Sequence, residues 1–363
     1  MRTAAPLKKP DFILLFATLS LVIFGLFMIY NASSVIAFRD FADKYYYIKE
    51  QSFNAVLGLI ALVFFYFFDY KRLYTLALPI LCMAILLLIA VFLPGVGVYA
   101  LGAHRWVNVG FTVIQPAEFV KLSLAIYLSA WFSTKERGRF FAFSLLLGLV
   151  LFLVMLQPDM GTASIILFEA IVLYFLSGAS LSHFMLMIPA VGVLGALLIL
   201  LAPYRLARLT AFLKTGDGFE NTSYHVKQIL IALGSGGLFG VGAGNSLQKY
   251  AYLPENVTDS IFAIIAEEFG FLGSIVFILV IFVVVWRGFY ISAHAKDAFG
   301  KLLAAGIISF LGVQAAINLA AMTALIPLTG VPLPFISYGG SALLVDLAAI
   351  GILLNISKQS HVR

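Results

Sequence analysis

The sequence has a single cysteine and few charged side chains. Cys82 lies inside an apolar run, which excludes a disulfide framework and a thiolate metal site. Charged residues make up 11% of the 363 residues and hydrophobic residues 62%, whereas soluble domains are roughly a quarter charged and half apolar. We therefore predict an integral membrane protein whose main solvent is lipid.

The motifs of common soluble enzymes are also missing. The chain has no His/Cys metal spacing, no glycine-rich phosphate loop followed by Lys-Ser/Thr, and no nucleophile elbow. Its formal charge of +6 comes from basic residues scattered over short loops, a pattern typical of membrane topology signals. Nucleic acid is not an expected partner.

Ten apolar segments approach the roughly 20 residues that a helix needs to cross a bilayer. We predict an all-α polytopic membrane protein, a single domain over 1–363, with spans at about 12–30, 53–68, 76–93, 115–133, 140–156, 160–177, 184–202, 260–286, 302–322 and 339–356. The short segments 53–68 and 140–156 are expected to extend into flanking residues. The first segment exceeds the h-region of a cleaved signal peptide and is expected to be retained.

The basic residues of the short loops orient these spans. With ten spans, one side collects Arg2, Lys8, Lys9, Lys71, Arg72, Lys135, Arg137, Arg139, Arg287, Lys296, Lys301, Lys358 and Arg363. The short loops of the other side hold only Arg39, Lys44, Lys49 and Arg105. Because cytoplasmic loops are enriched in Lys and Arg, both termini are predicted to be cytoplasmic.

One large outer loop, about 203–259, separates the seventh and eighth spans. Apolar residues recur at helical spacing over Tyr224–Gly234, and glycines between 234 and 244 mark turns or close backbone approach. Loops of this length are usually functional or disordered, and the aromatic and apolar content argues against disorder. The chain shows no inverted repeat of the transporter type.

Asp259 lies where this loop meets the eighth span. A partly desolvated carboxylate at the membrane interface can have a raised pKa and accept a proton from a sugar hydroxyl. The alternative is structural, since Thr258 or Asp259 would cap the following helix without any chemistry. From the residues alone, capping is the favoured interpretation. Glu255 fits either role.

Several ionisable or amide side chains fall within the spans. Glu118 and Lys121, spaced i,i+3 near the outer end of the fourth span, are predicted to pair, either for function or to lock two helices together. The same choice, a proton relay or cation site against hydrogen-bonded packing, applies to Glu169, Glu267, Glu268 and Asp346. Gln314 and Asn318 are predicted to join helices.

The outer face carries its own set of cations and a rigid bend. Arg105, Arg205, Arg208, Lys214, Lys227 and Lys249 could hold the phosphates of a lipid-linked substrate. Contact with anionic headgroups is the alternative and is favoured for Arg205 and Arg208. Between the ninth and tenth spans, the segment 332–341 has two prolines, two glycines and the hydroxyls of Ser337 and Ser341, which predict a bend with a polar pocket or a ligand-free re-entrant loop.

Eight motifs in this order resemble the SEDS family of bacterial cell-wall proteins (shape, elongation, division and sporulation), which includes FtsW and RodA. They are Arg105-Trp106-Val-Asn-Val-Gly110, Gln115-Pro-Ala-Glu118-Phe-Val-Lys121, Gln157-Pro-Asp159-Met-Gly161-Thr162, Gly240-Val-Gly-Ala-Gly244-Asn245-Ser246-Leu-Gln248-Lys249, Leu253-Pro254-Glu255, Thr258-Asp259, Glu267-Glu268-Phe-Gly270 and Pro334-Phe-Ile-Ser337-Tyr338-Gly339-Gly340-Ser341. The family's layout, ten spans with a large outer loop after the seventh, also matches.

This resemblance implies a peptidoglycan glycosyltransferase that polymerises lipid II at the outer face of the cytoplasmic membrane, in cell division or elongation. Asp259 matches the family's essential aspartate and would act as the catalytic base. Candidate substrate-binding residues are Arg105, Glu118, Lys121, Lys227, Lys249, Ser337 and Ser341, with the cations offsetting the pyrophosphate charge and Glu118 orienting Lys121. A divalent cation, Mg²⁺ or Mn²⁺, would assist the leaving group, although the sequence fixes no ligands for it.

The motif around Gly244–Glu255 is more similar to the FtsW branch than to the RodA branch. Val257, Ser260, Ala117 and Ala342 depart from residues usual in the family. The chain has no transpeptidase domain, and the resemblance implies a class B penicillin-binding protein as partner, alongside other division or elongation proteins.

Two other functions remain open at this level. A flippase or transporter for lipid II would fit the carboxylates within the spans, but the polar residues gather on one face and not at the midplane between repeats. A non-catalytic division scaffold would not require a carboxylate at position 259.

Overall fold

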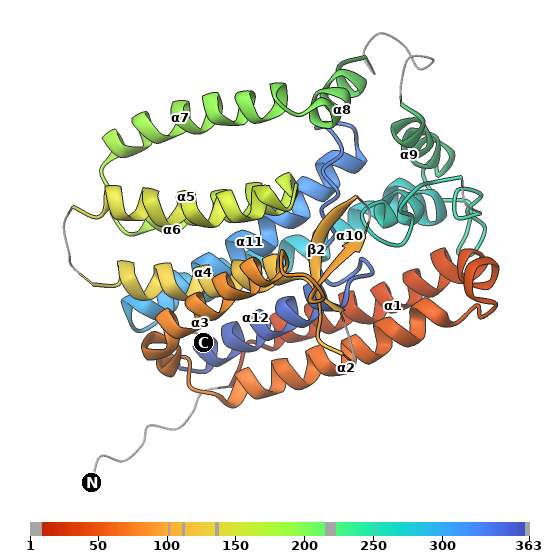
Figure 1. Cartoon of the computed structure of the whole chain (residues 1–363). Coiled ribbons are helices and arrows are strands. Elements are labelled where there is room, and N and C mark those ends of the chain that lie inside the picture. Colours follow the sequence, from red (N-terminus) through yellow and green to blue (C-terminus); the bar gives the residue numbers. More distant parts are fainter. Residues whose placement is uncertain are drawn as a thin grey trace.

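The structure, a computed structural model, describes residues 9–100, 102–110, 113–134, 138–214, 223–250 and 252–359. Within these residues the chain forms a bundle of long helices with one small sheet (Figure 1). The topology signals Arg2, Lys8, Lys135, Arg137 and Arg363 lie outside the described residues, as does the side chain of Lys214.

Each of the ten predicted spans contains one long helix. These helices are α1 (Phe12–Phe41), α2 (Tyr46–Phe67), α3 (Lys71–Ala90), α4 (Pro116–Phe132), α5 (Phe140–Leu156), α6 (Met160–Leu176), α7 (Leu181–Leu200), α10 (Ile261–His294), α11 (Ala298–Met322) and α12 (Gly340–Gln359). The expected extension is confirmed for α2, which begins at Tyr46. It is wrong for α5, because Gly138 with φ 77° precedes that helix and Pro158 follows its C-cap.

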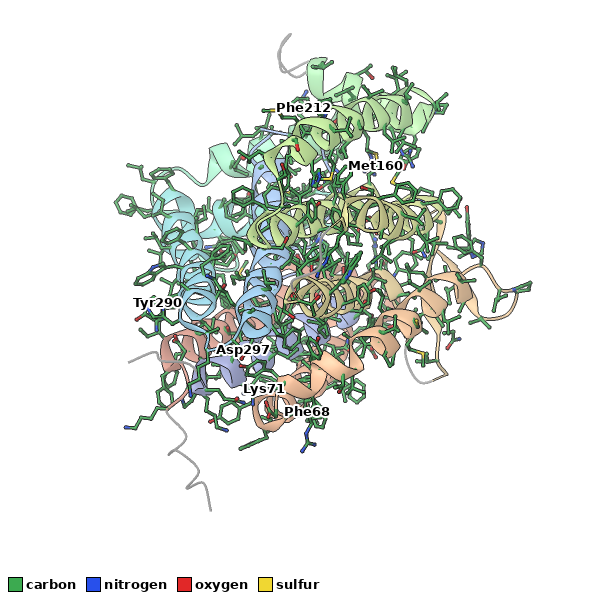
Figure 2. The ribbon with its side chains drawn as sticks, turned by 90° about the vertical axis from the view of Figure 1, so that its left-hand side faces the viewer. Phe68, Lys71, Met160, Phe212, Tyr290 and Asp297 are labelled. Carbon is green, nitrogen blue, oxygen red and sulfur yellow. The ribbon has the colours of Figure 1, made fainter. Side chains whose placement is uncertain are left out.

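Length and composition separate these helices further. Seven of them, α1, α2, α3, α7, α10, α11 and α12, are long and apolar enough to cross a membrane, and α5 and α6 are shorter apolar helices. The remaining one, α4, has 17 residues and carries Glu118 and Lys121. Large apolar side chains are exposed along the bundle, among them Phe64, Phe152 and Phe282, and Figure 2 shows such side chains projecting outward around the helices. This surface suits lipid, and the chain is a multi-pass membrane protein.

The start of α1 and the end of α12 lie at the same end of the bundle (Figure 1). The backbone N–H of Asp11 donates to Ser357 Oγ at 3.1 Å, and the Asp11 carboxylate forms an ion pair of 2.5 Å with Arg287 near the end of α10. Asp11 also caps α1 by accepting from the N–H of Leu14 at 2.9 Å. The start of α1 and the end of α12 on one side agree with an even number of crossings between them.

The described part of the predicted outer loop contains two helices. It contains α8 (Pro203–Lys214) and α9 (Tyr224–Ser235), so the helix expected over Tyr224–Gly234 is confirmed. Gly237, Gly240, Gly242 and Gly244 have positive φ angles, as expected of a turn segment. Figure 1 shows α8 and α9 at the end of the bundle opposite to the start of α1.

A three-stranded antiparallel sheet between α3 and α4 is not predicted by the sequence analysis. Its strands are β1 (Gly97–Ala100), β2 (Ala103–Asn108) and β3 (Val113–Ile114), in the order β1-β2-β3. The strands are too short to give a clear alternation of apolar and polar residues. The sheet places Arg105 beside the outer end of α6.

The helix α10 is broken at Gly270, which has φ 68° and ψ −167°. At this break the N–H groups of Val241 and Gly242 donate to the carbonyls of Glu267 and Glu268, each at 3.0 Å. A β-carbon on Gly270 would lie 2.3 Å from the nitrogen of Gly240. The break therefore lets the glycine-rich turn dock on the helix, and only glycine fits at this contact.

Candidate active site

Asp259 occupies the last turn of the outer loop, directly before α10, and is 8% exposed. Its backbone oxygen accepts a hydrogen bond from Asn318 Nδ2 at 2.7 Å, and the same amide lies 2.8 Å from the carbonyl oxygen of Val331. Asn318 was predicted to join helices, but it joins α11 to two loops. The amide fixes the backbone of the candidate base against the segment that follows α11.

The segment 332–341 holds the same turn from another side. Ser337 Oγ donates to the carbonyl of Thr258 at 2.5 Å and accepts from the N–H of Leu333 at 2.8 Å. The N–H of Tyr338 donates to the carbonyl of Val257 at 2.8 Å. The bend predicted for this segment is confirmed, and the Ser337 hydroxyl is used to position the chain next to Asp259.

The Asp259 carboxylate has two polar neighbours on its own turn. Thr258 Oγ1 lies 3.2 Å from Asp259 Oδ1 and 2.8 Å from Glu255 Oε2. Burial raises the pKa of Asp259 to about 6, and the negative charge of Glu255 acts in the same direction, while the Thr258 hydrogen bond and the positive charge of Arg208 oppose it. A carboxyl group with this pKa suits proton transfer near neutral pH.

The capping interpretation of Thr258 and Asp259 is wrong. The N-cap of α10 is Ser260, and no side chain makes a capping hydrogen bond there. The helix begins one residue later than capping by Asp259 would require, and Thr258 Oγ1 faces the two carboxylates instead. The Asp259 side chain is therefore not used to start the helix.

Two residues of the outer loop approach Asp259. His225 on α9 forms a hydrogen bond of 2.8 Å between Nε2 and the Oγ of Ser260, the next residue after Asp259. Arg208 on α8 is exposed, and its Nη1 donates to the carbonyl of Leu328 at 3.3 Å. Burial lowers the pKa of His225, and Arg208 acts in the same direction against the opposing charge of Glu255. The charges of Arg208 and Glu255 therefore act on the pKa of both Asp259 and His225.

The predicted pair of Glu118 and Lys121 is confirmed. Lys121 Nζ lies 2.7 Å from Glu118 Oε2 and 2.5 Å from Gln314 Oε1, and both charged residues are buried. Gln314 Nε2 in turn donates to the carbonyl of Pro332 at 3.1 Å. The pair therefore reaches the segment 332–341 through Gln314, which joins α4 and α11 as predicted.

Arg105 and Ser341 lie at a second outer cluster. The Arg105 guanidinium donates to the carbonyls of Gln157 at 2.9 Å and Pro158 at 2.7 Å, which anchors β2 to the turn before α6. Ser341 Oγ accepts from the N–H of Gln115 at 2.9 Å, directly before α4. The side chains are half-buried and serve here to connect elements.

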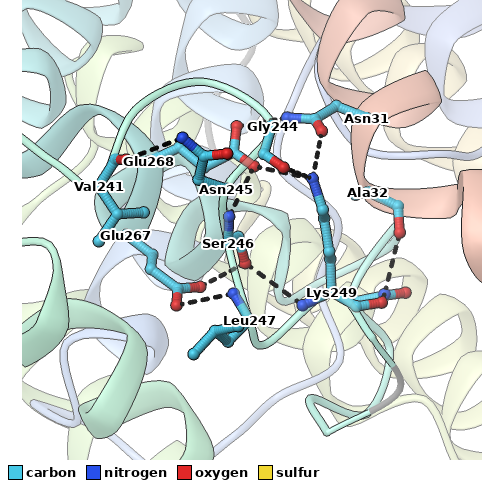
Figure 3. A network of polar contacts seen from close by, with 11 residues as sticks. Asn31, Ala32, Val241, Gly244, Asn245, Ser246, Leu247, Lys249, Glu267 and Glu268 are labelled. Atoms are coloured by element: carbon cyan, nitrogen blue, oxygen red, sulfur yellow. Dashed lines mark hydrogen bonds and ion pairs between the residues drawn. The ribbon is translucent and has the colours of Figure 1, made fainter.

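Lys249 belongs to a third cluster, drawn in Figure 3. Its Nζ contacts Asn31 Oδ1 at 2.8 Å, the carbonyl of Gly244 at 2.5 Å and Glu268 Oε1 at 3.4 Å. Asn31 donates to the other oxygen of Glu268. The cluster ties α1, the glycine-rich turn and α10 together, and Lys249 is buried within it.

The four carboxylates of the spans differ in their contacts. Glu267 accepts from Ser246 Oγ and from the N–H of Leu247, so hydrogen-bonded packing holds for Glu267 and Glu268. Glu169 is fully buried, and neither of its oxygens has a hydrogen-bond partner among the described residues. Hydrogen-bonded packing is therefore wrong for Glu169. Asp346 is fully buried on α12.

Two further predictions from the sequence concern Lys227 and a divalent cation. Lys227 is partly buried on α9, two residues after His225. In the part of the chain that the structure describes, no group of three or more His, Cys, Asp or Glu side chains could hold a metal ion. The residues around Asp259 do not form a ligand set, and we derive no step through a metal.

The sequence analysis missed two residues of the site. His225 was not singled out, although it lies directly before Val226, a buried residue of α9. Arg208 was assigned to headgroups because nothing in its local sequence connects it to Asp259, 51 positions along the chain. They come together only in the folded chain, where His225 on α9 bonds Ser260 and Arg208 on α8 bonds the carbonyl of Leu328.

Residues 12–362 match the protein family described as cell cycle protein, FtsW/RodA/SpoVE. The chain is 40% identical over 360 residues to the stage V sporulation protein E of Bacillus subtilis (strain 168), covering 97% of this chain and 98% of that protein. It is 37% identical over 359 residues to a probable peptidoglycan glycosyltransferase FtsW of Geobacter metallireducens, covering 97% and 96%. Sporulation is a branch that the sequence analysis did not weigh.

Solved structures agree over nearly the whole chain. One belongs to a peptidoglycan synthase complex that coordinates polymerization and crosslinking, with a TM-score of 0.79, 27% identity, and coverage of 96% of this chain and 97% of that chain. The rod shape determining protein RodA of Thermus thermophilus has a TM-score of 0.72 and 28% identity, with 98% of both chains covered. These identities are lower than those to the FtsW and sporulation proteins above, as the FtsW-like motif predicted.

Proposed function

Since the chain belongs to the FtsW, RodA and SpoVE family of cell cycle proteins, we propose that it is a peptidoglycan glycosyltransferase that polymerises lipid II. The observation that carries this proposal is Asp259. It is a buried carboxylate with a pKa raised to about 6, on a turn whose backbone is held by two elements, α11 and the segment 332–341. Fixed geometry and a matched pKa are what a general base requires.

The reaction transfers the growing glycan from one lipid carrier to the next sugar. The 4-hydroxyl of the acceptor's N-acetylglucosamine loses its proton to Asp259 as its oxygen attacks the anomeric carbon of the donor's N-acetylmuramic acid. The bond from that carbon to the pyrophosphate oxygen breaks, and its electron pair leaves with undecaprenyl pyrophosphate. A single displacement of this kind inverts the anomeric carbon and forms a β-1,4 link.

The residues around Asp259 have distinct tasks in this proposal. Glu255 and burial keep the carboxylate basic enough to take a proton, and Thr258 Oγ1 stabilises its charged form with a hydrogen bond. Ser337 and Asn318 hold the backbone on either side of the carboxylate. Positioning of this kind supplies much of the catalytic effect when two substrates must meet in one geometry.

The proposal includes an orientation and a partner. The Lys and Arg bias of the short loops supports cytoplasmic termini, which puts Asp259, at the opposite end of the bundle, on the outer face. The similar peptidoglycan synthase complex coordinates polymerization with crosslinking, and class B penicillin-binding proteins are crosslinking enzymes. A class B penicillin-binding protein is therefore the partner that we propose.

The test is polymerisation of labelled lipid II by the purified protein, alone and with a class B penicillin-binding protein, resolved on a gel that separates glycan chains by length. We expect ladders of glycan with the partner present. If no polymer forms under any partnered condition while labelled lipid II crosses vesicle membranes, the protein is a flippase. If neither occurs and cells still need the protein, a scaffold explains its role.

A further inference from the structure

Contacts of α8, of α9 and of the segment after α11 lead to the turn of Asp259, and Arg208 belongs to them. α9 is attached there by the hydrogen bond between His225 and Ser260. α8 is attached through Arg208, which donates to the carbonyl of Leu328. Leu328 lies three residues before Val331, whose carbonyl shares the Asn318 amide with the carbonyl of Asp259. This chain of contacts puts Arg208 on the rim of the site.

The guanidinium of Arg208 retains most of its hydrogen-bonding capacity. It has five N–H donors, and within the described residues it makes one hydrogen bond, at 3.3 Å. The side chain is exposed and lies over the ring of Tyr204 at 6.0 Å. Its charge also lowers the pKa of Asp259 and of His225, in agreement with its place beside both.

Three of the other cations proposed from the sequence already have protein partners. Lys121 is fully buried between Glu118 and Gln314. Lys249 is buried against Glu268. Arg105 uses two of its five donors on the carbonyls of Gln157 and Pro158, and these bonds hold it at the turn before α6. Neither Lys121 nor Lys249 can meet a new anion without breaking a buried ion pair.

We infer that Arg208 is an anion-binding residue of the donor site and that it takes the diphosphate of the lipid carrier. A guanidinium matches two phosphate oxygens with parallel N–H donors, and such charge-assisted hydrogen bonds are roughly twice as strong as neutral ones. When the bond to the anomeric carbon breaks, the diphosphate gains one negative charge, and Arg208 stabilises it. The inference rests on the proposed glycosyltransferase function.

The adjacent Arg205 offers a matched control. It lies on the same helix, three residues earlier, and its guanidinium donates to the carbonyl of Leu198 and to the Tyr204 hydroxyl, each at 3.0 Å. Arg205→Gln therefore changes the charge of α8 by the same amount without removing the cation beside Asp259. Arg208→Lys keeps the charge of α8 and removes the paired donors.

The experiment measures binding of undecaprenyl pyrophosphate to the full-length protein in nanodiscs of phosphatidylcholine alone. Losing a charge-assisted bidentate contact of roughly 1.5–3 kcal/mol predicts about 10- to 100-fold weaker binding for Arg208→Gln. Arg208→Lys should fall between that variant and the wild type, and Arg205→Gln should stay within about 2-fold of the wild type. The substitution Arg208→Gln should weaken the binding of undecaprenyl monophosphate less than the binding of undecaprenyl pyrophosphate.

Equal losses for Arg208→Gln and Arg205→Gln would overturn the inference. So would an effect of Arg208→Gln that appears only after anionic lipid is added, because the contact is then with headgroups. Diphosphate binding that depends on Arg208 in a protein that makes no polymer would support the site and contradict the glycosyltransferase. If the protein polymerises lipid II and Arg208→Gln binds the diphosphate as tightly as the wild type, the glycosyltransferase function is supported and the inference about Arg208 is contradicted.

Discussion

The hydroxyl of Ser337 donates to the carbonyl of Thr258 at 2.5 Å, so a loop after α11 holds the residue that precedes Asp259, the proposed catalytic base. Ser337→Ala leaves that carbonyl and the N–H of Leu333 without their buried partner, which should cost about 1–3 kcal/mol. Because the turn then moves, we expect kcat to fall about 10- to 100-fold with little change in KM. Thermal unfolding measures the loss of stability, and polymerisation rates measure kcat and KM.

The control for this substitution is Ser309→Ala. Ser309 is buried on α11, and its hydroxyl has no hydrogen-bond partner among the described residues. Ser309→Ala should lower the free energy of unfolding by less than about 1 kcal/mol and leave kcat unchanged, because removing an unpaired buried hydroxyl breaks no hydrogen bond. Similar losses for the two variants would show that Ser337 has no special role.

The pH dependence of polymerisation should report the protonation of Asp259. The base works only when ionised, so activity should fall as the pH drops through about 6. Glu255 raises this pKa, and Glu255→Gln should therefore move the acid limb to lower pH by about half a unit to one unit. Arg208→Gln should move it the other way, because it removes a charge that lowers the same pKa.

The exposed carboxylate of Glu50 provides the comparison for these profiles. Its charge acts on Tyr338, at the neighbouring loop, and not on Asp259. Glu50→Gln should leave the acid limb within about 0.2 units of the wild type. An acid limb that stays in place for both Glu255→Gln and Arg208→Gln would mean that another group limits the rate.

The buried pair of Glu118 and Lys121 should be strongly coupled. Lys121→Met leaves a buried carboxylate without its cation and should cost about 3–5 kcal/mol of stability. The double variant Glu118→Gln/Lys121→Met removes both charges and should cost less than the sum of the single variants. Unfolding temperatures of the protein in detergent, converted to free energies, give the coupling.

The exposed pair of Lys49 and Asp43, also 2.7 Å apart, sets the scale. Lys49→Met should cost no more than about 1 kcal/mol, because water and salt screen exposed pairs. If the effects of Glu118→Gln and Lys121→Met simply add, the two side chains do not stabilise each other.

His225 and Ser260 should form one functional unit. His225→Ala or Ser260→Ala breaks the hydrogen bond that attaches α9 beside Asp259, and each should weaken polymerisation by a similar factor of about 3- to 10-fold. The double variant should be no worse than either single variant. His225→Gln, which can still hydrogen-bond Ser260, should recover activity, whereas Ser235→Ala, which removes only a bond within α9, should have no effect.

Much of the fold follows from the sequence because lipid imposes simple rules. Ten apolar segments give ten helices, since a backbone in lipid must satisfy its own hydrogen bonds. The basic residues of the loops predict chain ends on one side, and Asp11 with Ser357 shows that those ends meet. The short sheet at Gly97–Ile114 was missed because strands this brief carry too little pattern.

The site was only partly predictable, because its contacts join distant parts of the chain. The spacing of Glu118 and Lys121 predicts their pairing, which is local to one helix. Arg208, His225 and Ser337 reach Asp259 from three separate elements, and no local pattern encodes that approach. Lys249 was expected at the pyrophosphate and instead neutralises Glu268, a contact that depends on the break at Gly270.

The most direct test of the account is lipid II polymerisation, with the partner present, by wild type and Asp259→Asn. Because burial raises the pKa of Asp259, the ionised carboxylate opposes folding above pH 6, by roughly 3 kcal/mol at most, so the variant should be as stable as the wild type or more so. We predict a folded variant that binds lipid II and makes no glycan. Glycan ladders of wild-type length and rate from Asp259→Asn would contradict the assignment of Asp259 as the base.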